Sequence, residues 1–73
     1  MSFQYAKLIG KIKECCGSQT AFAREMGLSE RTVSVKINGK VDWRQNEIAK
    51  ACVILGISRA EIPLYFFNQK VQN

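Results

Sequence analysis

Histidine is absent from this 73-residue sequence, and its absence limits the chemistry that the chain can perform. The three cysteines are Cys15, Cys16 and Cys52, and adjacent residues of a helix point in different directions. A metal site would therefore lack plausible ligands, and no cofactor is indicated. The cysteine count is odd and the sequence shows no signal peptide, so we expect the thiols to be reduced, as in a cytoplasm. We expect the cysteines to serve as small apolar residues.

Residue groups typical of catalysis and of membrane spans are also missing. No serine–lysine or carboxylate pair stands out, and we expect Glu25, Glu30, Asp42 and Glu47 to lie on surfaces or at helix caps. No apolar run approaches the ~18 residues that would span a membrane. We therefore expect neither an enzyme nor a membrane protein.

Repeats, linkers and low-complexity tracts are absent as well, so residues 1–73 should form one small domain. The net charge of +5 and the pI near 9.4 favour polyanionic partners. This charge would suit RNA, DNA or an acidic membrane equally, and many basic domains bind nothing in particular.

Apolar spacings of three and four residues predict an all-α fold with four or five helices. A first helix over residues 5–16 should end at Gly17, and Ser18 should cap a second helix. Asp42 is expected to cap a fourth helix from about Trp43 to Leu55, with Trp43 in the core. A short last turn should follow, which Pro63 interrupts before the apolar residues 64–67.

Residues 19–38 have the pattern of a helix-turn-helix. Gly27 tolerates the positive φ that a sharp reversal needs, Leu28 then enters the core, and Ser29 caps the third helix. Small Ala23 lets the two helices approach closely. The alternative is an ordinary helical hairpin in a small bundle.

The segment from Gln19 to Lys40 resembles the DNA-binding core of the phage Cro and CI-type (Xre-like) regulators. The resemblance lies in the opening glutamine, Ala23, Gly27, the apolar positions and the ending INGK. Many repressors carry an apolar residue at the position of Lys36, so the chain resembles Cro more closely. Its tail over residues 60–67, AEIPLYFF, resembles small regulators of phages of Gram-positive bacteria.

This resemblance implies a compact lambda-repressor-like domain that acts as a sequence-specific transcription repressor in the cytoplasm of a bacterial host. Few residues follow the motif, so we expect a minimal Cro-like regulator without a self-cleaving domain. It would bind a double-stranded DNA operator as a homodimer, with the third helix of each subunit in a major groove.

The expected DNA contacts follow from helix geometry and side-chain chemistry. If Val33 and Ile37 face the core, the opposite side of the third helix is exposed, and its side chains can read base edges. The predicted base-reading residues are Glu30, Arg31, Ser34 and Val35. The predicted backbone contacts are Gln19, Thr20, Ser29, Thr32, Lys36, Asn38 and Lys40. Alternatively, Glu30 and Arg31 form ordinary surface pairs, and Asn38-Gly39 is a plain helix stop.

The apolar tail gives the candidate dimer interface, which comprises Ile62, Leu64, Tyr65 and Phe66. The alternative is that Phe66 and Phe67 cover the first helix. Two rival functions also remain: an antirepressor-like modulator that binds another regulator or RNA polymerase, and an antitoxin that binds a toxin through the tail. Glu30 on the reading face and the aromatic tail keep the modulator hypothesis open.

Overall fold

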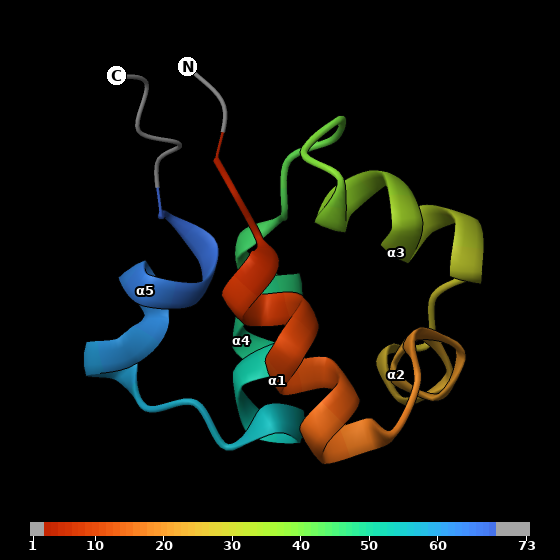
Figure 1. Ribbon diagram of the computed structural model, residues 1–73, viewed down its shortest axis with the longest axis horizontal. Helices are drawn as coiled ribbons and strands as arrows, with labels where there is room; N and C mark the ends of the chain where they lie inside the picture. Colours follow the sequence, from red (N-terminus) through yellow and green to blue (C-terminus); the bar gives the residue numbers. More distant parts are fainter. Residues whose placement is uncertain (1–2, 69–73) are drawn as a thin grey trace.

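The computed structural model describes residues 3–68, and within this range the fold contains helices and no β-strand. The elements, shown in Figure 1, are α1 (Ala6–Cys16), α2 (Gln19–Met26), α3 (Glu30–Ile37), α4 (Gln45–Leu55), the 3-10 turn η1 (Arg59–Glu61) and α5 (Ile62–Phe66). The predicted all-α fold is thereby confirmed. In the same range, no helix combines the length and apolar character needed to cross a bilayer.

Helix ends follow the expected capping residues in the first half of the chain. The Ser18 hydroxyl accepts a hydrogen bond from the Ala21 N–H at 3.1 Å, and the Ser29 hydroxyl accepts one from the Thr32 N–H at 3.1 Å. Each serine satisfies a backbone donor that has no partner within its helix. The two motif helices therefore begin where the sequence predicts.

Two predicted boundaries in the second half are wrong. The fourth helix begins at Gln45 with Arg44 at its N-cap, so Asp42 does not cap it and Trp43 lies in the preceding loop. The Arg44 N–H donates to the Glu47 carboxylate at 2.8 Å, which fixes this start. Pro63 lies in the first turn of α5, where its missing N–H is harmless, so it begins that helix instead of interrupting a turn.

A single core receives side chains from all five α-helices. Trp43 is 8% exposed and lies between Phe22 and Phe66, with ring centroids 6.4 and 5.4 Å away in edge-to-face geometry. The expectation that Trp43 is a core residue is confirmed. The buried residues contributed by the helices are Leu8, Ile12, Phe22, Ala23, Met26, Val33, Ile37, Ala51, Leu55, Tyr65 and Phe66.

The two motif helices and the last helix lie at opposite ends of the molecule. Figure 1 shows α2 and α3 at one end of the long axis and α5 at the other. The described ends of the chain meet beside α5, because the Gln4 N–H donates to the Asn68 carbonyl at 2.8 Å. The helix α3 is therefore well separated from α5.

Candidate functional site

The turn between α2 and α3 depends on Gly27, which has φ +73° and the left-handed conformation. The Gly27 N–H donates to the Arg24 carbonyl at 3.1 Å, and the Leu28 N–H donates to the Ala23 carbonyl at 2.9 Å. These bonds close the end of α2, and the Ser29 cap then opens α3. The turn thus holds α3 with one side against the core and the other toward solvent.

The predicted DNA contacts fall into an exposed and a half-buried group. We call the outward side of this motif the helix-turn-helix face. Its exposed residues are Thr20, Ser29, Glu30, Arg31, Asn38 and Lys40, and its half-buried residues are Gln19, Thr32, Ser34 and Val35. The structure leaves these side chains wholly or partly accessible, and whether they contact DNA stays a prediction.

Several side chains of the helix-turn-helix face bond to one another. The Thr20 hydroxyl donates to the Glu30 carboxylate, which holds a negative charge at the N-terminus of α3. The Asn38 amide donates to the Ser34 carbonyl at 2.8 Å, so it acts as a helix stop. A fixed carboxylate at the tip of α3 repels phosphate, because both groups are anionic. This face therefore mixes acidic, basic and neutral groups.

Lys36 is not on the helix-turn-helix face, and its expected contact with the DNA backbone is wrong. It is 4% exposed, because the roll of α3 turns Val33, Lys36 and Ile37 inward. Its Nζ forms an ion pair with Glu47 at 2.8 Å and donates to the Asp42 carbonyl at 3.0 Å. The ammonium group also lies 5.9 Å from the Trp43 ring centroid. Lys36 therefore joins α3 to α4.

The ionisation of Glu47 reflects this contact. Burial by itself would raise the pKa of the Glu47 carboxyl. The hydrogen bonds from Lys36 and from the Arg44 N–H, together with the charges of both residues, outweigh burial and lower the pKa below its ordinary value. Glu47 is thus held as a carboxylate beside the buried ammonium group.

The candidate dimer interface is only half supported by exposure. Tyr65 and Phe66 are 8% and 1% exposed, so their assignment to an interface is wrong: they pack in the core of the single chain. Leu64 is 50% exposed and Ile62 is partly buried, and for these two a dimer contact stays a prediction. Phe67 packs on Phe3 with ring centroids 5.8 Å apart.

The sequence interpretation missed the group formed by Lys36, Asp42 and Glu47 around Trp43. A signal was present in the spacing, because Lys36 lies three residues after Val33 and so shares its side of a helix. Glu47 gave no such signal, because the residue three positions before it is Arg44, which is not a typical N-cap. The spacing of Lys36 did not lead to a buried position because lysine is almost never fully buried unless it is paired.

Comparisons with known proteins match the chain to a family and to a solved structure of a phage regulator. The family described as "Protein of unknown function (DUF739)" matches residues 1–69. The solution structure of the modulator of repression of the temperate bacteriophage TP901-1 from Lactococcus lactis is 56% identical, covering 99% of this chain and 97% of that one, with a TM-score of 0.81. No curated protein matches the chain.

These matches correct the assignment drawn from the resemblance. The chain is similar to a phage modulator of repression, so its placement among Cro/CI-type, Cro-like DNA-binding repressors is wrong. The expected link to phages and to regulation agrees with the matched structure. That structure is of a regulator, and the matched family indicates no catalytic activity.

Proposed function

The chain belongs to the DUF739 family, and we propose that it modulates repression by binding a second regulatory protein. The observation that carries this proposal is the 56% identity to the TP901-1 modulator of repression over 99% of this chain. At such identity and a TM-score of 0.81, the two chains share their fold. We place the action in the cytoplasm of a bacterial host, as befits a phage regulator.

The helix-turn-helix face supports a protein partner over a nucleic acid. Glu30 presents a carboxylate that suits a lysine or arginine of the partner, and exposed Arg31 beside it suits a partner carboxylate. A face with both signs of charge fits the mixed charges of another protein better than the uniform negative charge of duplex DNA. Transcription would then change because binding of this chain alters the partner's binding to DNA or its self-association.

Co-purification tests the proposal directly. The chain is co-expressed with the repressor encoded by the same phage or prophage, and the complex is measured by size-exclusion chromatography and calorimetry. We expect a complex of the two proteins and a change in the repressor's affinity for its operator. The proposal fails if no complex forms, or if the purified chain alone protects a specific operator at physiological salt.

The variant Glu30→Gln locates the contact. Truncating one member of an interfacial charge pair costs about 2 kcal/mol or more, so we expect the affinity for the repressor to fall roughly thirtyfold. Glu25→Gln is the matched control, because Glu25 is also an exposed acid of the motif helices. Its charge acts toward α1, where it helps to raise the pKa of the Cys16 thiol. Equal affinities of the two variants would move the partner away from the helix-turn-helix face.

A further inference from the structure

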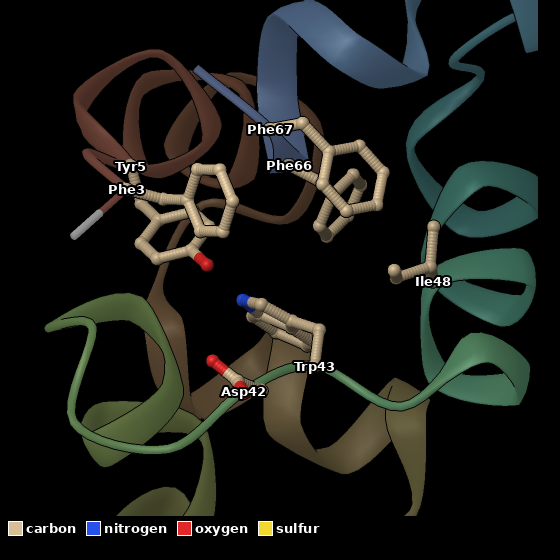
Figure 2. A pocket seen from close by; sticks show the side chains of 7 residues that line it. All are labelled: Phe3, Tyr5, Asp42, Trp43, Ile48, Phe66 and Phe67. Atoms are coloured by element: carbon tan, nitrogen blue, oxygen red, sulfur yellow. The ribbon is translucent and has the colours of Figure 1, made fainter. Parts of the chain in front are cut away.

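A cavity of about 220 Å³ opens where the N-terminal segment, the loop after α3 and the C-terminal end of α5 meet. Figure 2 shows its side chains converging from these segments, with Ile48 of α4 facing them. The rings of Phe3, Phe66 and Phe67 form an apolar wall. Phe67 is 49% exposed, so this wall is open to solvent on one side.

The opposite end of the cavity is polar, and one of its donors has no partner. Trp43 is 8% exposed, and its Nε1–H is buried without any acceptor among the described residues. In Figure 2 the indole nitrogen points between the Tyr5 hydroxyl and the Asp42 carboxylate. A buried donor without an acceptor is costly, so a native structure normally supplies one.

Tyr5 and Asp42 define what that acceptor must also do. Burial of Tyr5, and next the charge of Asp42, raise the pKa of the Tyr5 hydroxyl, so it keeps its proton at neutral pH. The exposed Asp42 carboxylate can only accept hydrogen bonds. The protonated Tyr5 hydroxyl can donate or accept. A ligand atom that bonds to both Trp43 and Asp42 must accept from Trp43 and donate to Asp42.

A phenol hydroxyl meets both conditions, and its ring suits the aromatic wall. An anionic ligand would be repelled by Asp42, and a cation would leave the Trp43 N–H without an acceptor. A plain hydrocarbon would also leave it unpaired. Water would satisfy the polar end, but the apolar rings of Phe3, Phe66 and Phe67 would then stay in contact with solvent, which is unfavourable.

The surroundings favour a phenol carried on a polypeptide. The cavity is smaller than the roughly 300–1,000 Å³ typical of sites for free small molecules. A second cavity of about 360 Å³ adjoins it, sharing Ile48 and Phe67 and bordered by Arg59. A chain with a tyrosine in the first cavity and an apolar side chain in the second would fill both.

We propose that this aromatic cavity binds a tyrosine side chain of a partner polypeptide, whose hydroxyl accepts from the Trp43 Nε1–H and donates to the Asp42 carboxylate. The inference rests on the proposed function, because it names one contact that a protein partner makes. It places that contact apart from the helix-turn-helix face, beside α5.

N-acetyl-tyrosinamide and N-acetyl-phenylalaninamide test the cavity in the isolated protein. Trp43 is the one tryptophan, so its Nε1–H gives a single resonance in a ¹H–¹⁵N spectrum. We expect the tyrosine amide to shift that resonance and to bind about tenfold more tightly than the phenylalanine amide. Equal binding of the two amides, or binding without a shift of the Nε1–H, would overturn the proposal.

Variants assign the preference to the two polar groups. Asp42→Ala and Trp43→Phe should each bring the preference for tyrosine over phenylalanine close to one, measured from the Ile48 amide, while circular dichroism confirms that they fold. Glu14→Ala, which removes an exposed acid of α1, should keep the preference. A preference that survives both cavity variants counts against the site.

Two further measurements separate the other occupants. If p-cresol binds more than tenfold more tightly than the tyrosine amide, the cavity takes free phenols, and the choice of a polypeptide is wrong. If a long-lived water stays bonded to the Nε1–H at saturating amide, the cavity is a hydration site and the proposal fails. Neither result affects complex formation with the repressor, so the two proposals fail separately.

Discussion

Trp43 packs against side chains from several separate parts of this small core. Its ring lies between Phe22 of α2 and Phe66 of α5, and the Lys36 ammonium group lies over it. It therefore connects the two ends of the molecule, although it belongs to no helix.

We expect Trp43→Ala to destabilise the protein by roughly 3–5 kcal/mol, because it leaves a large cavity among aromatic neighbours. This is a large part of the stability of a small domain. Urea unfolding followed by circular dichroism measures the change, and Trp43→Phe should lose much less because a ring remains. A Trp43→Ala protein as stable as the wild type would show that the indole is not a packing residue.

Glu47 is the second residue whose side chain we expect to contribute strongly to stability. We expect Glu47→Gln to cost about 3 kcal/mol, because it leaves the Lys36 ammonium group buried without a counter-charge. Glu61→Gln is a matched control: Glu61 occupies the same capping position after Ser58 but is exposed and has no buried partner. The control should lose less stability, and equal losses would reduce the role of Glu47 to capping.

The pH dependence of stability should differ between the wild type and Glu47→Gln. The folded pKa of Glu47 lies below its ordinary value of 4.5, so the folded state binds fewer protons than the unfolded state near that pH. The stabilisation is full above pH 4.5 and is lost as the pH falls through the folded pKa. We expect the wild type to lose more stability than Glu47→Gln between about pH 5 and pH 3. Parallel curves in urea titrations would contradict this.

At the scale of elements, the parts of the fold determined by local chemistry were predictable and the parts determined by pairing were not. Ser18, Ser29 and Gly27 act through their own backbone neighbours, so the boundaries of α2 and α3 follow from the sequence. The inward turn of Lys36 depends on Glu47, which lies eleven positions later and on another helix. Periodicity along one helix contains no information about that partner.

The C-terminal residues illustrate the same limit. A run of large apolar side chains from Leu64 to Phe67 shows that something must cover them, and it does not show what. The structure places Tyr65 and Phe66 in the core and exposes half of Leu64 and Phe67. Which of these four side chains are buried depends on the direction of α5 after Pro63, and tertiary packing sets that direction.

Two glycines should respond to the same substitution with opposite signs. Gly27→Ala should destabilise by about 1–2 kcal/mol, because φ +73° suits only glycine well even though a Cβ there would meet nothing closer than 3.8 Å. Gly10→Ala should stabilise by about 0.5–1 kcal/mol, because Gly10 lies inside α1 with open space around it. Thermal unfolding of both variants tests the pair, and a stabilised Gly27→Ala would contradict the strained turn.

At the scale of the whole molecule, the helix-turn-helix pattern did not identify the family. The apolar positions Phe22, Met26, Val33 and Ile37 specify how the two motif helices pack, and a regulator that binds protein needs the same packing as one that binds DNA. The sequence therefore led to the correct all-helical fold and to the wrong family. The features that kept the modulator hypothesis open were Glu30 on the exposed side of the third helix and the aromatic tail, and the 56% identity to a modulator of repression agrees with that hypothesis.

The single domain expected over residues 1–73 leads to a last prediction about cooperativity. Trp43 packs against side chains of α2 and α5 at once, so neither end of the molecule can unfold without exposing the indole. We therefore expect Trp43 fluorescence and helical circular dichroism to change together in one two-state transition, in urea and on heating. If the fluorescence changes at a lower urea concentration than the circular dichroism, α5 and the residues around Trp43 form a separate, weaker unit. Because Phe66 is 1% exposed, Phe66→Ala should lower the midpoint by both probes equally.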